Sequence, residues 1–130
     1  MNRRNILACF CAAAFVLSLL PAQAMEEKPF QRSAFETAQA ASNPILLHVS
    51  APWCETCQAQ KAVLKKLESD PAFAPYSLFN IDFDSEKSVM RSFGVRGRST
   101  LIAFKGRAEV GRLVGDTRAE SIKALMKKGL

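Results

Sequence analysis

Two cysteines three positions apart, Cys54 and Cys57, are the residues of this sequence best suited to chemistry. They follow an apolar run at 45–49 and open a segment at 55–68 whose apolar residues recur with helical spacing. A spacing of three brings both sulfurs to one face of the first helical turn, close enough to form a disulfide. Unpaired N–H groups at a helix N-terminus stabilise a thiolate, which favours Cys54 as the attacking cysteine and Cys57 as the resolving one. The pattern predicts reversible thiol–disulfide exchange at a strand-to-helix turn.

Zinc binding is the first alternative, because two cysteines at this spacing are also half of many zinc sites. A structural zinc ion takes four ligands, whereas residues 25–130 contain two cysteines and one histidine. A structural disulfide is a second alternative, but a bridge between residues this close in sequence closes almost no loop in the unfolded chain. Both observations favour exchange chemistry.

The first 24 residues have the pattern of a cleaved export signal. Two arginines precede an apolar run from Ile6 to Leu20, and Pro21 ends that run before the small residues of Ala22-Gln23-Ala24. The run is shorter than the ~20 apolar residues that span a bilayer, which favours cleavage after Ala24 over a membrane anchor. A lipoprotein signal fits poorly, since Cys9 lies before most of the apolar region instead of after it. We expect residues 1–24 to be a signal peptide that directs the protein to the periplasm.

The remaining chain, residues 25–130, has the length of one domain. It carries 16 basic and 12 acidic residues, a net charge of +4 at neutral pH. These charges are scattered, without a basic cluster or interleaved aromatic residues, so we expect no nucleic-acid partner. We expect contact with the membrane only during export, and a monomeric protein.

Predicted strands and helices alternate along this domain, which is typical of an α/β fold with a mixed sheet flanked by helices. Short apolar runs predict strands at 45–49, 76–83, 100–104 and 109–114, the last two joined by a turn at 105–107. Predicted helices lie at 34–41, at 55–68, from Asp84 or Ser85 to 93, and from Thr117 to about 128. Capping boxes at Ser33/Glu36 and Thr117/Glu120 mark two helix starts, and Gly94 ends another helix. The predicted buried face of the helix at 55–68 consists of Ala59, Ala62, Val63 and Leu67.

Two segments resemble the signature motifs of the thioredoxin family. Residues 49–57 (Val-Ser-Ala-Pro-Trp-Cys-Glu-Thr-Cys) resemble its active-site segment, and residues 93–106 are similar to its Gly-Val-x-x-x-Pro-Thr-Leu-x-x-Phe-x-x-Gly run. The resemblance implies the thioredoxin-like fold and exchange with the disulfides or thiols of protein substrates through a mixed disulfide. It implies no cofactor beyond the Cys54–Cys57 disulfide. It also implies substrate contacts at Trp53, Arg98, Ser99 and Thr100, and a membrane electron donor for an exported reductant.

Ser99 departs from the family pattern, which has a cis-proline facing the cysteine pair at this position. A cis bond before a residue other than proline costs ~3–4 kcal/mol, so we expect a trans bond or a strained loop. The serine adds an N–H and a hydroxyl near the sulfurs, either of which could stabilise a thiolate or help to hold a metal ion. The alternative is neutral drift in a loop that still supports exchange.

His48 is the second departure, because it stands six residues before Cys54, where the resemblance implies a buried aspartate that accepts a proton. A histidine can take that role, since small changes in its surroundings move its protonation through neutral pH. The alternative is a hydrogen-bonded core histidine without a chemical role.

The direction of electron transfer depends on charges near Cys54. Glu55, which lies with Thr56 between the cysteines, disfavours the thiolate by repulsion and so predicts a reductant. Arg96 and Arg98 act in the opposite sense if they lie near the site, and are otherwise solvated surface charges.

Two other functions stay open at this point. One is a metal chaperone in which Cys54, Cys57 and His48 hold a soft ion such as Cu(I). The other is a folded adaptor whose cysteine pair is unused.

Overall fold

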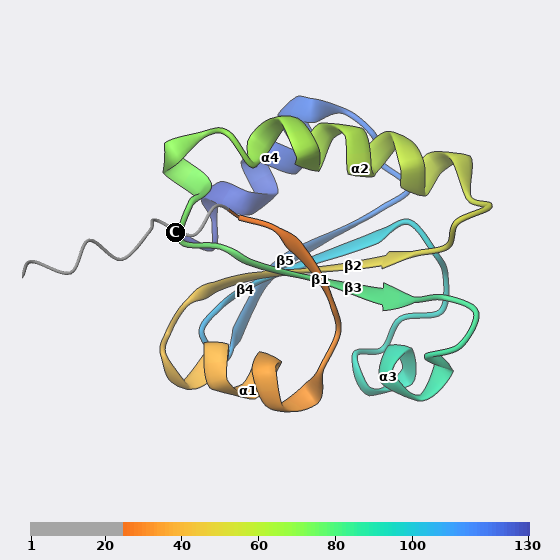
Figure 1. The fold of residues 1–130 in the computed structure, drawn as a ribbon, viewed down its shortest axis with the longest axis horizontal. Helices are drawn as coiled ribbons and strands as arrows, with labels where there is room; N and C mark the ends of the chain where they lie inside the picture. Colours follow the sequence, from red (N-terminus) through yellow and green to blue (C-terminus); the bar gives the residue numbers. More distant parts are fainter. Residues whose placement is uncertain (1–24) are drawn as a thin grey trace, which may run out of the picture.

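The computed structural model describes residues 25–130, so the predicted signal peptide lies outside the described residues. Within this range a five-stranded sheet lies between two layers of helices, as the sequence predicts (Figure 1). In chain order the elements are β1 (Glu27–Pro29), α1 (Arg32–Ala40), β2 (Pro44–Ser50), α2 (Glu55–Leu67), the short 3-10 helix η1 (Pro71–Phe73), β3 (Ser77–Asp82), α3 (Lys87–Ser92), β4 (Thr100–Lys105), β5 (Ala108–Val114) and α4 (Ala119–Lys127).

The sheet is mixed, with the strand order β1-β3-β2-β4-β5. β1 and β2 run parallel to β3, whereas β4 runs antiparallel to β2 and to β5. Helices α2 and α4 cover one face, and α1 and α3 cover the other (Figure 1). β2 is therefore a central strand with helices on both faces, which explains why its sequence is an almost continuous apolar run.

Side chains of β2 alternate between the two faces of the sheet. Ile45, Leu47 and Val49 belong to the core beneath α1 and α3, whereas Leu46 belongs to the core beneath α2 and α4. The first core also contains a group of edge-to-face aromatic rings, formed by Phe30, Phe35, Phe79, Phe93 and Phe104. His48 lies two residues after Leu46 and therefore points to the same face of the sheet, toward the helix that carries the cysteines.

The buried face of α2 differs from the prediction. Ala59 and Ala62 are exposed, and Val63 and Leu67 are only partly buried. The fully covered positions are Cys57, Gln60 and Leu64, one turn apart along the helix. Val63 and Leu67 pack against the core as predicted, but Ala59 and Ala62 do not. The prediction missed Gln60 because it assigned only apolar residues to the core, whereas the Gln60 amide is buried with every polar atom hydrogen-bonded.

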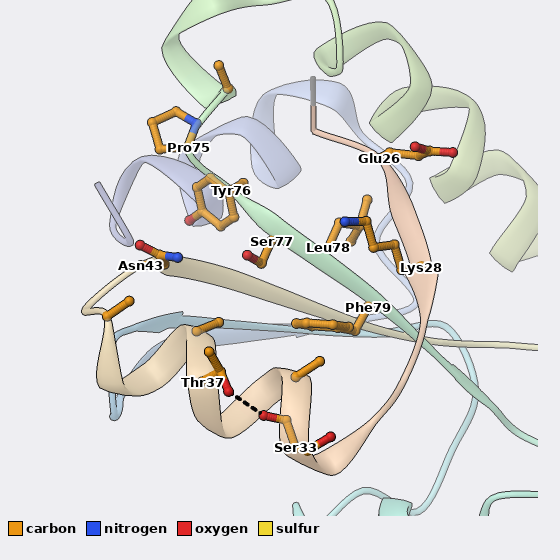
Figure 2. Close-up of a pocket in the computed structure, with 14 residues that line it drawn as sticks. Glu26, Lys28, Ser33, Thr37, Asn43, Pro75, Tyr76, Ser77, Leu78 and Phe79 are labelled. Atoms are coloured by element: carbon orange, nitrogen blue, oxygen red, sulfur yellow. Dashed lines mark hydrogen bonds between the residues drawn. The ribbon is translucent and has the colours of Figure 1, made fainter. Parts of the chain in front are cut away.

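The predicted helix caps were also wrong. α1 begins at Arg32, and Ser33 lies inside the helix, where its carbonyl accepts a hydrogen bond from the Thr37 hydroxyl (Figure 2). α4 begins at Ala119, so Thr117 lies before the helix and caps nothing; the carboxylate of Asp116 instead accepts from the N–H and guanidinium of Arg118.

The start of α3 also differs from the prediction. Asp82 accepts the N–H groups of Asp84 and Ser85 in a turn, which delays the start of this helix to Lys87. These two hydrogen bonds hold the pKa of Asp82 below its usual range. As predicted, Gly94 follows the helix, and it has a positive φ of 66°.

β1 was not predicted. It has three residues, two of them charged and one a proline, so it lacks the apolar alternation of a strand. Its pairing with β3 joins Glu27 to Leu78 and Pro29 to Asn80 in register. This pairing brings Glu27 near β2, where it contacts His48.

A pocket of about 530 Å³ lies between α1, β1 and the start of β3 (Figure 2). None of the site residues predicted from the sequence lines it. Separately, none of the helices in residues 25–130 is long and apolar enough to span a bilayer.

Tyr76, the single tyrosine of the chain, generates a prediction about alkaline stability. Its hydroxyl is buried and donates to the carbonyl of Met126, and burial raises the pKa of Tyr76 to about 12. The unfolded chain releases this proton near pH ~10, so the free energy of unfolding should fall by up to about 2 kcal/mol as the pH rises from ~10 to ~12. Denaturant unfolding at a series of pH values measures this loss. Tyr76→Phe should remove this component, and an unchanged alkaline profile in that variant would contradict the assignment.

Candidate active site

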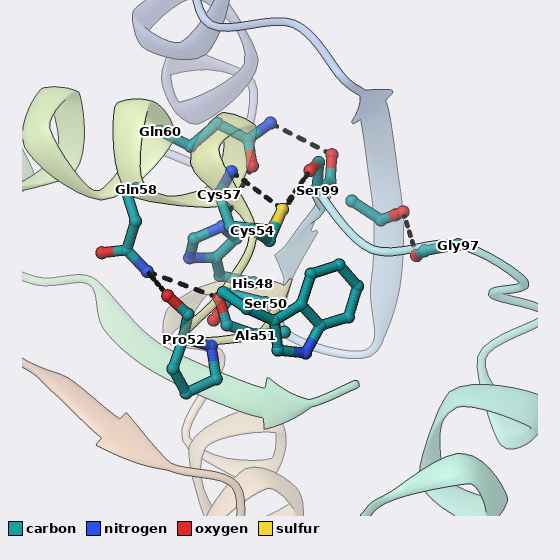
Figure 3. The surroundings of a disulfide bond; sticks show 12 residues. His48, Ser50, Ala51, Pro52, Cys54, Cys57, Gln58, Gln60, Gly97 and Ser99 are labelled. Atoms are coloured by element: carbon teal, nitrogen blue, oxygen red, sulfur yellow. Dashed lines mark hydrogen bonds between the residues drawn. A yellow bond between two sulfur atoms is a disulfide. The ribbon is translucent and has the colours of Figure 1, made fainter. Parts of the chain in front are cut away.

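Cys54 and Cys57 form a disulfide at the turn from β2 into α2, as the spacing predicts (Figure 3). Their Cα atoms are 5.2 Å apart, and both side chains are buried. Cys54 is the N-cap of α2, and its sulfur accepts a hydrogen bond of 3.2 Å from the backbone N–H of Cys57. The sulfur of Cys54 therefore occupies the position where the N–H groups of the helix stabilise negative charge.

Ser99 lies directly against both sulfurs. Its hydroxyl oxygen is 3.3 Å from the sulfur of Cys54 and 3.2 Å from that of Cys57 (Figure 3). All peptide bonds in residues 25–130 are trans, and Ser99 has a left-handed φ of 58°. This conformation costs a residue with a side chain roughly 1 to 2 kcal/mol. Of the two alternatives expected for this departure, a trans bond or a strained loop, the trans bond is found, and the backbone of Ser99 is strained as well.

Hydrogen bonds hold Ser99 in this conformation. Its N–H donates to the carbonyl of Val49 at 2.8 Å, a bond that a proline could not make. Its carbonyl accepts the N–H of Gly115 at 2.8 Å and the side-chain amide of Gln60 at 3.0 Å. The neighbouring Thr100 is buried, and its hydroxyl donates to the carbonyl of Gly97, so this side chain supports the loop from beneath.

Trp53 forms an exposed rim beside the disulfide. Its side chain is 56 % exposed, and the guanidinium of Arg98 lies 4.9 Å from the ring centroid. The indole N–H donates to the carboxylate of Asp84 at 2.8 Å, and the ring meets Phe83 edge to face. Trp53 and Arg98, both predicted from the sequence, are thus brought together. Asp84 and Phe83 were not predicted, because they follow β3 and only its parallel pairing with β2 brings them to this end of the sheet.

Glu55 and Thr56 are the first two residues of α2, and both are exposed. A carboxylate in the first turn of a helix is favourable for the helix itself. Glu55 can influence Cys54 only through its charge, since its side chain makes no hydrogen bond or ion pair within residues 25–130. Arg96 is exposed as well.

His48 is completely buried behind the disulfide. Its Nε2 lies 3.0 Å from Oε1 of Gln60, and its Nδ1 lies 3.2 Å from Oε1 of Glu27. Both ring nitrogens are therefore engaged, and within the described residues no hydrogen bond joins the ring to either sulfur.

This arrangement bears on the metal-binding alternative. Among residues 25–130 no group of three histidine, cysteine or acidic side chains converges as metal ligands do. His48 faces Glu27 and Gln60, so it does not complete a site with the two cysteines. The structure therefore gives no support to a site in which His48 and the cysteines share a Cu(I) ion.

Gln60 and Glu27 are the partners of His48 that sequence reasoning missed. A glutamine at a buried helical position is a usable signal, since polar residues there need partners. Glu27 gave no signal, because its contact depends on the unpredicted β1.

Asp116, whose backbone carbonyl accepts the Gln60 amide, has its own carboxylate paired with Arg118. The hydrogen bond from the Arg118 guanidinium holds the pKa of Asp116 well below its usual range.

Comparisons with known proteins agree with this geometry. The profile of the thioredoxin family matches residues 26–128. Thioredoxin from Chlamydia muridarum is 34% identical over 89 residues, which are 68% of this chain and 84% of the relative. The crystal structure of Trxlp from Edwardsiella tarda superimposes with a TM-score of 0.75 at 33% identity, covering 78% of this chain and 98% of that one.

A thioredoxin from Malassezia sympodialis shares the fold alone, with a TM-score of 0.69 at 18% identity over 82% of this chain and 93% of its own. The family profile covers nearly the whole described domain, and the cysteine pair lies at the expected strand-to-helix turn. The chain therefore belongs to the thioredoxin family, whose members exchange thiols and disulfides with their own cysteine pair and use no external cofactor.

Proposed function

We propose that this protein is exported and reduces the disulfides of protein substrates in the cell envelope. The observation that carries the proposal is the position of the Cys54 sulfur, which is the N-cap of α2 and accepts the N–H of Cys57 at 3.2 Å. A thiolate formed there is stabilised by the helix N-terminus and is the reactive form of cysteine.

The reaction transfers two electrons in two exchange steps. The Cys54 thiolate attacks one sulfur of a substrate disulfide, a mixed disulfide forms, and the other substrate sulfur leaves as a thiolate that takes up a proton. Cys57 loses its proton and attacks the sulfur of Cys54, which releases the second substrate thiol and leaves the Cys54–Cys57 disulfide. A dithiol on a membrane protein is the proposed donor that reduces this disulfide again.

The exposed rim around the cysteines is the proposed substrate-binding surface. Trp53 offers an apolar face, and the guanidinium of Arg98 stacked on it adds positive charge. Ser99 lies at the sulfurs, whereas Thr100 is buried and acts by supporting the loop. The participation of His48 in proton transfer stays a prediction, because both of its ring nitrogens are engaged in the disulfide form.

Export is supported by the sequence, and the monomeric state is a prediction. The basic start, the apolar run from Ile6 to Leu20 and the small residues before Met25 support cleavage after Ala24. Expression of the full chain in a Gram-negative host should give a periplasmic protein whose first residue is Met25. Retention of residues 1–24 or a cytoplasmic product would contradict export, and light scattering of the product tests the monomer.

Serine variants should separate the roles of the two cysteines. Cys54→Ser should reduce the rate of substrate reduction to background, because the attacking sulfur is lost. Cys57→Ser should form a mixed disulfide that persists, because the resolving sulfur is lost. Mass spectrometry after incubation with a disulfide-linked peptide distinguishes the free protein from the trapped adduct. Trapping by Cys54→Ser in place of Cys57→Ser would reverse the assignment.

The reduction potential of the Cys54–Cys57 couple tests the reductant role. We expect a value near or below about −250 mV, the region of thioredoxin, from equilibration in thiol buffers with mass-resolved alkylation. Values of about −120 to −180 mV would instead indicate a disulfide donor or isomerase.

Glu55→Gln should make the couple more oxidising, because it removes a negative charge beside the Cys54 thiolate. Glu120→Gln is the matched control, since Glu120 is an exposed acidic residue in the first turn of α4, a different helix. An equal shift in both variants, or no shift in Glu55→Gln, would contradict the role of Glu55.

A further inference from the structure

Gln60 has a buried side-chain amide whose orientation is fixed by its neighbours. Its Nε2 donates to two backbone carbonyls, those of Ser99 and Asp116, each at 3.0 Å. Both partners can only accept, so the nitrogen must face them and Oε1 must face His48 at 3.0 Å. Gln60 thereby ties α2, which carries the cysteines, to the loop that carries Ser99.

The contact with Gln60 also fixes the tautomer of His48. Since Oε1 of Gln60 can only accept, Nε2 of His48 carries a hydrogen. Nδ1 faces Oε1 of Glu27 at 3.2 Å, so the Glu27 carboxylate holds the ring from its other side. Glu27 is held in turn by β1, and its side chain is 21% exposed.

These contacts form one polar chain that runs from the partly exposed Glu27 through buried residues to the sulfurs. Its members are Glu27, His48, Gln60 and Ser99. At its inner end, the Ser99 hydroxyl lies within 3.3 Å of both sulfurs, and the backbone of Ser99 is in the left-handed region. A residue in this strained conformation keeps its place only where neighbours fix it, and the Gln60 amide is one of the groups that do so.

The Ser99 hydroxyl has a chemical consequence for the reduced protein. In the disulfide it faces two weak acceptors, but after reduction it can donate to the Cys54 thiolate, and hydrogen bonds to charged groups are the strong ones. A donor at this position stabilises the thiolate, and therefore the reduced form, relative to the disulfide. The strength of the effect depends on where the hydroxyl is held.

We propose that Gln60, oriented by His48 and Glu27, is a positioning residue that holds the Ser99 hydroxyl against the sulfurs and thereby sets the redox equilibrium of the Cys54–Cys57 pair. The proposal rests on the proposed thiol–disulfide exchange. It assigns to Gln60 a role in tuning the reaction, although its side chain touches neither sulfur.

The test compares Gln60→Met, Ser99→Ala and the double variant. Methionine keeps the length and volume of the side chain but removes its hydrogen bonds. Each single variant should lower the equilibrium constant for reduction by glutathione about tenfold and move the pH midpoint of Cys54 alkylation upward by about one unit. The double variant should shift no further than Ser99→Ala alone, because Gln60 acts through Ser99.

Two control variants separate positioning from stability. Gln39→Met makes the same change in α1, which covers the other face of the sheet (Figure 1), and should leave both quantities unchanged. Leu64→Ala removes buried packing from α2 and should lower the free energy of unfolding without moving the equilibrium constant. His48 is the single histidine of the chain, so its ¹⁵N resonances are unambiguous, and they should show a protonated Nε2 that changes in Gln60→Met.

The possible results are distinguishable. If Gln60→Met lowers stability but leaves the equilibrium constant and the alkylation midpoint at wild-type values, Gln60 is structural and the proposal is wrong. Additive shifts in the double variant would also overturn it, since Gln60 would then act without Ser99. A wild-type protein that fails to exchange with glutathione would contradict the proposed function, whereas alkylation of its reduced Cys54 would still test the role of Gln60.

Discussion

Strand β2 is buried on both faces, and the position of the Cys54–Cys57 pair depends on this constraint. Its odd-numbered residues pack beneath α1 and α3, and Leu46 packs beneath α2 and α4. A register shift of one residue would move every one of these side chains to the opposite face. The same alternation points His48 toward α2. The strand ends at Ser50 and the turn that follows it carries Cys54, so the register that buries the core also fixes the position of this turn.

Burial on both faces also imposes a requirement on polar groups. His48 and Gln60 have no exposed surface, and each polar atom of their side chains has a partner. An unpaired polar atom in such a place would cost about 1–3 kcal/mol. The partners come from β1, the Ser99 loop and the segment before α4. The hydrogen bonds of two buried side chains therefore connect three distant parts of the chain.

The sequence predicts the elements with strong periodicity and the site residues that adjoin a motif. The element order, the mixed sheet and the Cys54–Cys57 disulfide are found where apolar runs and cysteine spacing place them. The predicted starts of α3 and α4 were wrong, and at both places an aspartate side chain, Asp82 or Asp116, forms a turn with the backbone N–H groups that follow it. β1 was not predicted because three residues that include a proline carry no periodic signal. Glu27, whose contact depends on that strand, was therefore missed. Gln60 was missed because the buried face of a helix was predicted from apolar residues alone. The partners of its amide are distant in sequence, so nothing near Gln60 indicated that it is buried.

The backbone of Ser99 has an evolutionary consequence. A proline at this position has no N–H to donate to Val49, and its ring holds φ near −65°, far from the 58° observed. A single substitution of this serine by proline is thus incompatible with the present backbone of the loop. It would also displace the carbonyl of residue 99 that accepts the Gln60 amide. Descent toward the proline typical of the family would therefore require the backbone of this loop to be rebuilt in the same step.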